Sequence, residues 1–375
     1  MKVAIITNIV TVYREGFYDR LFSNKDFVVT VYCNDHIKGT NLKSIHEKYG
    51  DRVKIVPHIG LKNEKIGFQF LPITEIIRSH DVIFLDGNPR TLSNLLIGFI
   101  ALFLRNTKVV MWTMAHSYGA NKITENLRLK WTSIYKNIFV YTDKEVATLR
   151  NRGFKKQNII GMNNGLDQRK IDGQIAIWTG SSIDNWKKDR HLESNFILLS
   201  VARLVPKNKF QLMIKALPLL VQSIPEVKWI IIGDGEEKIS LIELAKKLDV
   251  AKYIIFAGSI FEEEELAPYF LSSKIFIHPS SVGLSIMHAF GYGLPIIVDG
   301  VEGMHGPEYG AFRNNETGKN YDRNDSEDLA NKIIEIAKQP LLLEEMKKNV
   351  VKIAREKYNI DIMVNRFIEM IKVAN

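Results

Sequence analysis

The sequence contains one cysteine, Cys33, among 375 residues, and it has no uninterrupted apolar run of 18 residues. A single cysteine excludes an internal disulfide and suits a reducing cytoplasm. The longest apolar stretch, LLIGFIALFL at 95–104, is too short to cross a bilayer, and we interpret it as a buried helix between two strands. The N-terminal stretch MKVAIITNIV lacks the long apolar core of a signal peptide and predicts a first strand instead.

The motifs of several common functions are also missing. We find no helix-turn-helix pattern, no zinc-ligand spacing and no aromatic RNA-binding motif, which argues against nucleic acid as a partner. No Gly-x-Gly-x-x-Gly follows the first strand, so the first domain is not an ordinary dinucleotide site. There is no Asp-x-Asp and no pair of carboxylates arranged as nucleophile and base. We therefore expect no metal and no cofactor.

The positive charge is unevenly distributed along the chain. The net charge is +9, yet residues 1–170 hold 26 Lys and Arg against 14 Asp and Glu, a balance of +12. The remaining residues must then carry −3. A basic first half predicts an anionic partner, such as a phosphorylated substrate or an anionic membrane surface.

Strand and helix patterns alternate along most of the chain and predict an α/β protein. The length exceeds that of one ordinary core, and the alternation is typical of a doubly wound parallel sheet. We expect two Rossmann-like domains that face a cleft: residues 1–172, a polar linker at 173–192, and residues 193–356. Residues 357–375 predict a final helix, and its apolar pattern allows it to cross back to the first domain.

Cations and small residues follow several of the predicted strands, where ligands of such sheets bind. This pattern suits a phosphorylated ligand. The candidate site residues that follow the predicted strands, whatever their type, are Tyr13, Arg14, Asp86, His116, Arg203, Lys207, Lys209, Gly233, Asp234, Ser259 and Ile260.

Five landmarks in order within the second domain resemble the donor-binding half of GT-B glycosyltransferases of family 4. They read ARLVPKNK, GDGEE, FAG, HPSSVGLSIMHAFGYGLP and HGPE. The first domain is similar more loosely, through VYREGF, WTMAH and NNGLD. The resemblance implies a transferase of the hexosyltransferase type that takes its sugar from a nucleotide-diphosphate donor, UDP or GDP.

The resemblance also implies which residues hold the donor. In that family the loop before the helix receives the diphosphate on backbone N–H groups, where small residues and the helix N-terminus favour an anion. The implied donor-binding residues here are Lys207, Gly233, Asp234, Ser259, Ile260, Ser280, Ser281, Val282, Gly283, Leu284, Ser285 and His288.

Two positions depart from the family pattern. The family has two glutamates eight positions apart, the first near the donor sugar and the second on the nucleotide ribose. Here Ser280 and His288 occupy those positions. A neutral imidazole at His288 accepts one hydrogen bond and donates one, so it can still bind a ribose.

The resemblance implies a retaining, metal-independent reaction in which the leaving phosphate takes the acceptor proton. Charge on the leaving diphosphate requires cations, and Arg203 with Lys209, or Lys207 in second place, would supply them. His116 would face the donor sugar. Tyr13, Arg14 and Asp86 would bind the acceptor.

From the resemblance we expect the acceptor to be a glycan or a lipid-linked sugar in bacterial surface polysaccharide assembly, such as lipopolysaccharide or capsule. We expect a cytoplasmic protein that associates with the inner face of the plasma membrane through its basic first domain. Two other functions stay open: a GT-B nucleotide-sugar epimerase, and a non-catalytic subunit that binds sugar nucleotides.

Overall fold

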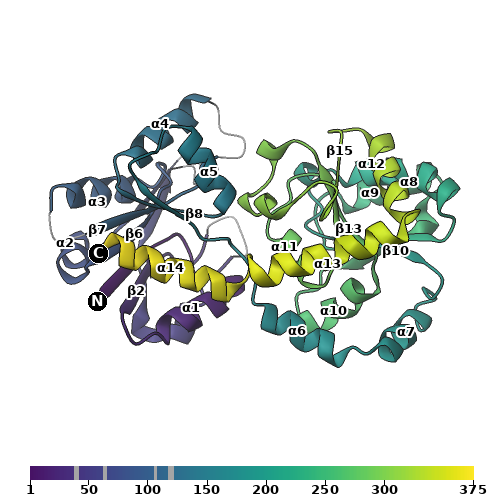
Figure 1. Ribbon diagram of the computed structural model, residues 1–375, viewed down its shortest axis with the longest axis horizontal. Coiled ribbons are helices and arrows are strands. Elements are labelled where there is room, and N and C mark those ends of the chain that lie inside the picture. The colour runs from purple at the N-terminus through teal and green to yellow at the C-terminus, as the bar shows by residue number, and fades with distance from the viewer. Residues whose placement is uncertain (38–41, 62–65, 105–107, 117–121) are drawn as a thin grey trace. The chain divides into compact units, whose positions relative to one another are not determined.

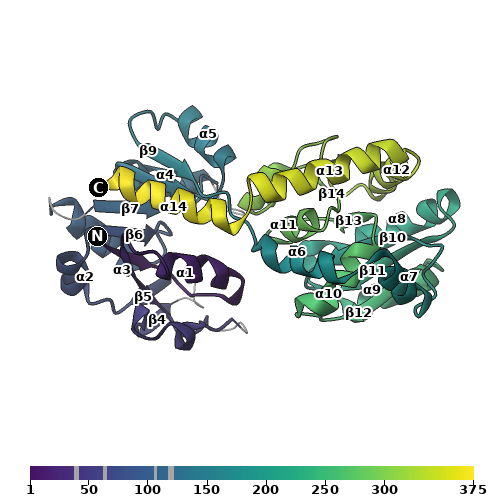
Figure 2. The same ribbon diagram turned by 60° about the horizontal axis from the view of Figure 1, so that its bottom comes forward.

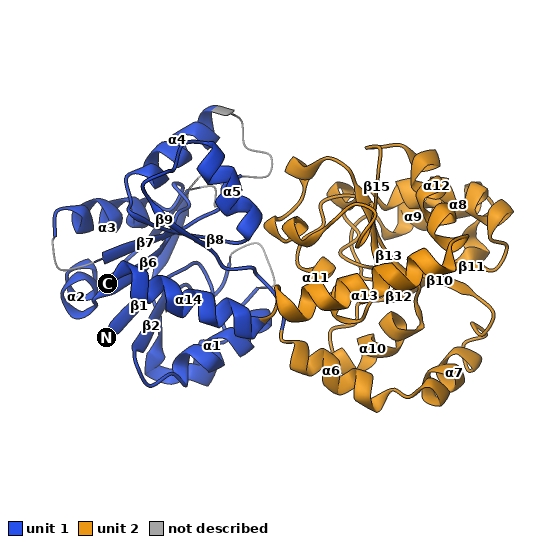
Figure 3. Ribbon diagram, viewed as in Figure 1, with its two compact units in different colours: residues 1–166, 360–375 blue, residues 167–359 orange. Residues whose placement is uncertain are grey.

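The structure is a computed structural model that describes residues 1–37, 42–61, 66–104, 108–116 and 122–375. The chain divides into two compact units (Figure 3). Unit 1 comprises residues 1–166 and 360–375, and unit 2 comprises residues 167–359. Both units are parallel-sheet α/β structures, as the sequence predicts.

The described residues of unit 1 form a sheet of seven parallel strands and a separate antiparallel hairpin. The strands are rich in β-branched and aromatic residues and are buried on both faces, as parallel strands require. In spatial order the strands of the sheet are β3 (Val53–Ile55), β2 (Val28–Cys33), β1 (Lys2–Ile6), β6 (Val82–Asp86), β7 (Lys108–Trp112), β8 (Asn137–Val140) and β9 (Asn158–Gly161), and the hairpin is β4 (His58–Leu61) with β5 (Ile66–Gln69).

Helices cover both faces of this sheet (Figures 1 and 2). One core cluster joins α1 and α14 to the sheet, and a second joins α2, α3 and α4 to it. The helices of unit 1 are α1 (Glu15–Phe22), α2 (Ile73–Ser79), α3 (Leu92–Leu102), α4 (Lys122–Ser133), α5 (Asp143–Asn151) and α14 (Ile360–Ala374), with the short 3-10 turns η1 (Val12–Arg14) and η2 (His46–Arg52).

The last helix, α14, belongs to unit 1 although it follows unit 2 in the sequence (Figure 1). The Phe367 ring stacks on the Phe84 ring of β6, with 4.0 Å between centroids. Arg366 pairs with Asp143 of α5, and Arg20 of α1 lies 2.6 Å from Asp361. The amphipathic pattern of residues 357–375 thus buries its apolar side against the first sheet.

Unit 2, all of whose residues the structure describes, has one sheet of six parallel strands. Its core includes the fully buried Trp229, whose indole N–H donates to the Ser200 hydroxyl 2.9 Å away. In spatial order the strands are β12 (Ile254–Gly258), β11 (Val227–Ile232), β10 (Phe196–Val201), β13 (Ile275–His278), β14 (Ile296–Asp299) and β15 (Gly318–Tyr321).

The helices of unit 2 alternate with these strands. They are α6 (Gln168–Ile177), α7 (Gly180–Lys188), α8 (Phe210–Ser223), α9 (Lys238–Lys247), α10 (Glu263–Ser272), α11 (Ser285–Gly291), α12 (Ser326–Ala337) and α13 (Pro340–Glu356), with the 3-10 turns η3 (Pro206–Asn208), η4 (Ala251–Tyr253), η5 (Glu302–Met304) and η6 (Pro307–Ala311).

The structure corrects the expectation of an irregular linker at 173–192, because this stretch is largely helical. The polar sequence around Gly-Ser-Ser begins α7. The Thr179 hydroxyl accepts a hydrogen bond from the Ser182 N–H and caps the helix. Trp186 of α7 is buried and packs edge-on against Tyr269 of α10, with ring centroids 4.9 Å apart.

The strand order reverses at one place in each sheet, between β1 and β6 in unit 1 and between β10 and β13 in unit 2. Loops that leave the carboxyl ends of such neighbouring strands diverge to opposite faces and leave a crevice where ligands bind. These two places therefore locate the candidate site residues of each unit.

Candidate functional site

The loop between β13 and α11 is anchored to the segment that follows β14. The Val282 N–H donates to the His305 Nδ1 atom over 3.1 Å, and the Val282 carbonyl accepts from the Gly306 N–H over 2.8 Å. The His305 Nε2 atom lies 2.8 Å from the Asp299 carbonyl, so the ring carries its proton on Nε2. Ser281 has a φ of 45°, which turns the chain sharply before the helix.

The next three N–H groups of this loop are open. Gly283, Leu284 and Ser285 have no acceptor for their N–H groups among the residues that the structure describes. The Val282 N–H, which we expected to face a diphosphate, is instead used by His305. The open N–H groups therefore begin at Gly283, one residue closer to the helix than we expected.

Two buried polar atoms lie at the base of the loop. The Ser280 hydroxyl and the His278 Nδ1 atom have no hydrogen-bond partner within the described part of the chain. Burial, followed by the influence of His305, lowers the pKa of His278 to about 4, so this ring is neutral at pH 7. Ser280 is only 1% exposed, so it cannot reach a donor sugar without a movement of the loop.

The segment after β10 places three cations near the same strand ends. The Asn208 side chain, between the two candidate lysines, is buried and donates to the Arg203 carbonyl over 2.8 Å. Lys209 has a left-handed backbone with a φ of 52°, and its Nζ atom donates to the Asn324 side chain over 2.6 Å. Because the Asn208 side chain is buried, the cationic side chains of this stretch are those of its two neighbours in the sequence, Lys207 and Lys209.

The charges of the two lysines interact with residues at the ends of different strands. The charge of Lys207 contributes to the lowered pKa of His278 at the end of β13, after burial and His305. Burial and then the nearby Arg323 lower the pKa of Lys209, while Asp299 at the end of β14 opposes them. Both lysines therefore lie within electrostatic reach of the β13 to β14 edge, and the structure does not single out one of them.

The Gly-Asp-Gly turn after β11 fixes the path of the chain that carries Arg203. Gly233 has a φ of 144°, and a Cβ atom there would lie 2.0 Å from the Ala202 carbonyl oxygen. The Leu204 N–H donates to the Asp234 carbonyl over 2.9 Å. The exposed Asp234 carboxylate pairs with Lys238, 2.9 Å away. Gly233 is thus required for packing, and Asp234 contributes its backbone to the same contact.

Ser259 and Ile260 follow β12, the edge strand of the sheet. Two strands, β11 and β10, separate β12 from β13. The sheet therefore does not bring these two residues next to the β13–α11 loop.

His288 of α11 does not stand alone. Its Nε2 atom lies 2.8 Å from the Glu263 carboxylate at the start of α10, and the Tyr292 hydroxyl donates to the same oxygen. The ring also packs on Phe270, with centroids 4.5 Å apart. Burial alone would raise the pKa of Glu263, but the His288 and Tyr292 hydrogen bonds hold it below its usual value. The sequence alone could not reveal this carboxylate, because Glu263 and His288 meet only when α10 and α11 pack together.

The carboxylate of Glu308 is a second acidic group beside the β13–α11 loop. The sequence places Glu308 far along the chain, but η5 and η6 fold back across the loop. A Cβ atom on Gly283 would lie 4.0 Å from the Glu308 Oε2 atom, and Glu308 is buried. An acidic oxygen is thus present beside the open N–H groups, although position 280 is a serine.

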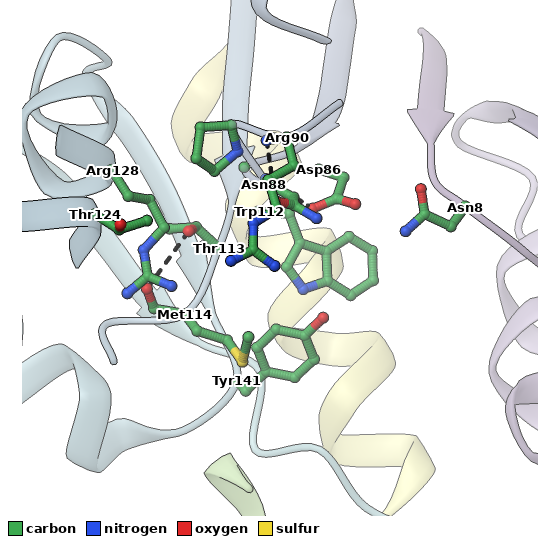
Figure 4. Close-up of a pocket in the computed structure, with 12 residues that line it drawn as sticks. Asn8, Asp86, Asn88, Arg90, Trp112, Thr113, Met114, Thr124, Arg128 and Tyr141 are labelled. Carbon is green, nitrogen blue, oxygen red and sulfur yellow. Dashed lines mark hydrogen bonds between the residues drawn. The ribbon is translucent and has the colours of Figure 1, made fainter. Parts of the chain in front are cut away.

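Unit 1 has a pocket of 390 Å³ at the carboxyl ends of β1, β6, β7 and β8 (Figure 4). In Figure 4 the indole of Trp112 lies between Asp86 and Tyr141, and Asn8 reaches toward the pocket from the end of β1. Carboxyl, amide and aromatic groups are the side chains that bind sugar hydroxyls and ring faces. The lining residues are Asn8, Asp86, Gly87, Asn88, Pro89, Arg90, Trp112, Thr113, Met114, Thr124, Arg128 and Tyr141.

Asp86 is the carboxyl group of this pocket. Its Oδ1 atom accepts from the Asn88 N–H over 3.0 Å, and its carbonyl accepts from the Asn94 side chain over 3.0 Å. Burial raises the pKa of Asp86 to about 6. The group therefore changes between hydrogen-bond donor and acceptor close to neutral pH.

Arg14 lies close to two aromatic residues of the pocket. Its guanidinium is 5.5 Å from the Trp112 ring centroid and 5.9 Å from that of Tyr141, at distances typical of cation–π contacts. Tyr13 is exposed on η1 and lies 5.8 Å from the same guanidinium. Arg14 thus contacts two residues that line the Asp86 pocket, although neither Arg14 nor Tyr13 lines the pocket itself.

His116 follows β7 but does not line the Asp86 pocket. Its Nδ1 atom lies 3.3 Å from a Glu125 carboxylate oxygen, and Glu125 also pairs with Arg152. These three residues line a different hollow of unit 1, between α4 and α5. The structure therefore separates His116 from the predicted acceptor residues.

Among the described residues, no three His, Cys, Asp or Glu side chains are grouped so that they could hold a metal ion.

Residues 182–357 match the family described as glycosyl transferases group 1. Two curated relatives are the GtfA subunits of UDP-N-acetylglucosamine–peptide N-acetylglucosaminyltransferases. The protein of Streptococcus parasanguinis is 25% identical over 179 residues, or 47% of this chain and 34% of that protein. The protein of Streptococcus agalactiae is 25% identical over 291 residues, or 75% of this chain and 51% of that protein. The chain thus spans about a third to a half of these relatives.

Among solved structures, HepE of Anabaena in complex with UDP superposes with a TM-score of 0.73 at 16% identity, and both chains are covered completely. At this identity the likeness establishes the fold, which is GT-B.

Proposed function

Because residues 182–357 match the glycosyl transferases group 1 family, we propose that the chain transfers a sugar from a nucleotide-diphosphate sugar to a glycan or lipid-linked acceptor. One observation carries the proposal: three open N–H groups, at Gly283, Leu284 and Ser285, lie on the loop beside the cationic segment of unit 2. Such groups bind the oxygens of a phosphate without any reorganisation.

On the donor side, Gly283, Leu284 and Ser285 would hold the diphosphate, and Arg203 with Lys209 or Lys207 would neutralise the charge that develops on it. A hydrogen bond to a charged group contributes about 1.5–3 kcal/mol. HepE was crystallised with UDP, which favours a UDP-sugar over a GDP-sugar as the donor.

The reaction would be retaining and metal-independent. The bond between the anomeric carbon and the diphosphate oxygen breaks while the acceptor oxygen bonds to the same face of that carbon. The leaving phosphate oxygen takes the acceptor proton, so no protein carboxylate has to act as base. His116 would contact the donor sugar in this scheme.

The acceptor would bind in the unit 1 pocket that Asp86, Trp112 and Tyr141 line. A polar, aromatic pocket of this size suits one or two sugar rings. The basic charge of residues 1–170 supports an acceptor at an anionic membrane surface, and with it a role at the inner face of the plasma membrane in surface polysaccharide assembly.

The test is a thermal-shift screen against UDP-, GDP-, dTDP- and CMP-sugars, followed by transfer assays with the sugar nucleotide that binds. We expect stabilisation by a UDP-sugar and transfer to a lipid-linked or glycan acceptor. Appearance of a new nucleotide sugar without acceptor would identify an epimerase instead. Donor binding without transfer to a broad acceptor panel would favour a non-catalytic subunit, which the loss of glutamate at Ser280 and His288 also suggests.

A further inference from the structure

The helix α3 of unit 1 is apolar on its outer face as well as on its inner face. Leu92, Leu96, Phe99 and Phe103 are exposed, and their spacing of four, three and four residues places them in one stripe along the helix. Phe103 is 72% exposed, and its ring lies 5.1 Å from that of Phe99. The inner face, with Ile97 and Ala101, already covers the sheet, so the core does not explain the outer stripe.

The neighbouring helix α4 repeats this pattern. Ile123 and Leu127 are exposed four residues apart on one face of α4, and Ile134, in the turn just after the helix, is exposed as well. Ile123 is 72% exposed. Trp131 of α4 approaches α3 at Gly98, where a Cβ atom would lie 3.2 Å from the Trp131 ring. We call the surface made by Leu92, Leu96, Phe99, Phe103, Ile123, Leu127 and Ile134 the α3–α4 face.

The α3–α4 face cannot act as a membrane span. At 11 residues α3 is about 16 Å long, roughly half of the hydrocarbon thickness of a bilayer. No helix in the described ranges is long and apolar enough to cross a membrane. An exposed apolar face of this kind fits an interface along which the helices lie flat.

The charge of the same segment selects the partner. Residues 87–142 hold seven Lys and Arg and one acidic residue, Glu125. Lys130 and Lys136, on α4 and just after it, are exposed. Two copies of so basic a segment would repel each other face to face, whereas anionic lipid headgroups would be attracted.

We propose that the α3–α4 face docks on a bilayer that contains anionic lipids. Phe99, Phe103 and the leucines of α3 enter the boundary between headgroups and acyl chains, and Lys130 and Lys136 contact lipid phosphates. This inference rests on the membrane role in the proposed function and adds the residues that dock. Vesicle binding can be measured without any sugar transfer, so docking and transfer can fail separately.

The first test is co-sedimentation of the full chain with vesicles of equal parts phosphatidylglycerol and phosphatidylcholine. The variant Phe99→Ser/Phe103→Ser should bind at least about tenfold more weakly than the native chain. The matched control is Phe261→Ser/Leu341→Ser, which removes apolar side chains of unit 2 that are 86% and 88% exposed, and it should bind as the native chain does.

Salt and lipid charge test the electrostatic part. Binding should weaken as salt rises from about 0.05 to 0.5 M, because exposed charges are then screened over a few ångströms, and pure phosphatidylcholine should bind less. Equal binding to neutral and anionic vesicles, or no binding of the native chain to either, overturns the proposal.

A second measurement does not depend on the stability of a variant. Cys33 is fully buried, so a cysteine placed at position 103 can be labelled selectively with a polarity-sensitive dye. Phe103→Cys should show a blue shift on addition of anionic vesicles, and Phe261→Cys should not. Equal responses at both positions overturn the docking face. So does sedimentation that shows the native chain as a dimer and Phe99→Ser/Phe103→Ser as a monomer.

Discussion

The Nε2 atom of His288 lies 2.8 Å from the Oε1 atom of Glu263, so the imidazole donates its Nε2 proton to a carboxylate on the neighbouring helix. The Nδ1 atom then remains as the acceptor that a ribose hydroxyl could use. A carboxylate is thus still present next to the position where the family has its second glutamate, but it acts through the ring.

If His288 holds the ribose through its Nδ1 atom, His288→Ala should weaken donor binding because it removes that acceptor. Glu263→Gln should also weaken donor binding by freeing the ring. The measurement is the donor dissociation constant of the native chain and of the two variants at one pH. Identical affinities would make His288 and Glu263 a packing pair.

Glu263 also predicts a change in stability. Its pKa is held below the usual glutamate value by hydrogen bonds, although burial opposes them. A lowered carboxyl pKa stabilises the fold above the unfolded pKa of about 4.3, and this contribution is lost as pH falls through the folded pKa. The free energy of unfolding, measured with urea from pH 6 to 3, should therefore fall more steeply for the native chain than for Glu263→Gln.

Asp86 should behave in the opposite way. The folded pKa of Asp86, about 6, lies above the unfolded value. Ionisation of Asp86 therefore lowers the free energy of unfolding as pH rises from about 4 through 6. Asp86→Asn should remove this loss and stabilise the chain at pH 7.5 by up to about 3 kcal/mol. The comparison is the free energy of unfolding of both proteins at pH 4.5 and 7.5, and equal differences at the two values would contradict it.

Arg203→Ala should weaken donor binding and lower turnover, because it removes a charged hydrogen bond to the diphosphate worth about 1.5–3 kcal/mol, or roughly 10- to 150-fold. Arg78→Ala, at an exposed position of α2, is the control and should have no effect. Unchanged kinetics in a folded Arg203→Ala protein would remove this residue from the site.

Glu308→Gln should separate sugar recognition from nucleotide recognition. The carboxylate lies beside Gly283, so its loss should lower turnover by about tenfold or more while the affinity for UDP alone stays the same. Glu302→Gln, exposed on η5, serves as control. A parallel loss of UDP affinity would show that Glu308 supports the loop rather than the sugar.

Gly233→Ala should destabilise unit 2 by several kcal/mol, because the new methyl group would lie 2.0 Å from the Ala202 carbonyl at a φ of 144°. Gly173→Ala is a matched control in α6, where a Cβ atom meets nothing within 4 Å and alanine favours the helix by about 1 kcal/mol. Thermal unfolding of both variants checks the difference.

Local patterns account for what the sequence could predict. The apolar run that ends at His278, the small-residue loop and the helix that carries His288 lie where the pattern indicates, because burial and turn chemistry are local signals. The Gly-Ser-Ser stretch misled the interpretation, since Thr179 caps a helix there and its stability comes from the burial of Trp186.

The carboxylates near α11 could not be predicted in the same way. Glu263 precedes His288 by 25 residues, and Glu308 follows Gly283 by the same number, so only the folding of α10 and of η5 and η6 brings them close. Similarly, the use of the Val282 N–H by His305 depends on the tautomer of a ring from another loop. Contacts of this kind carry no periodicity in the sequence.

The position of α14 has a consequence for how the chain is made. The ribosome releases β6 and β8 early, but Phe367, which covers Phe84 and Phe139, follows only after all 193 residues of 167–359. At about 5–20 residues per second, this face of the first sheet stays uncovered for roughly 10 to 40 s. Unit 2 can therefore be complete before unit 1, which reverses the usual order of domain folding during synthesis and gives chaperones an apolar surface to protect.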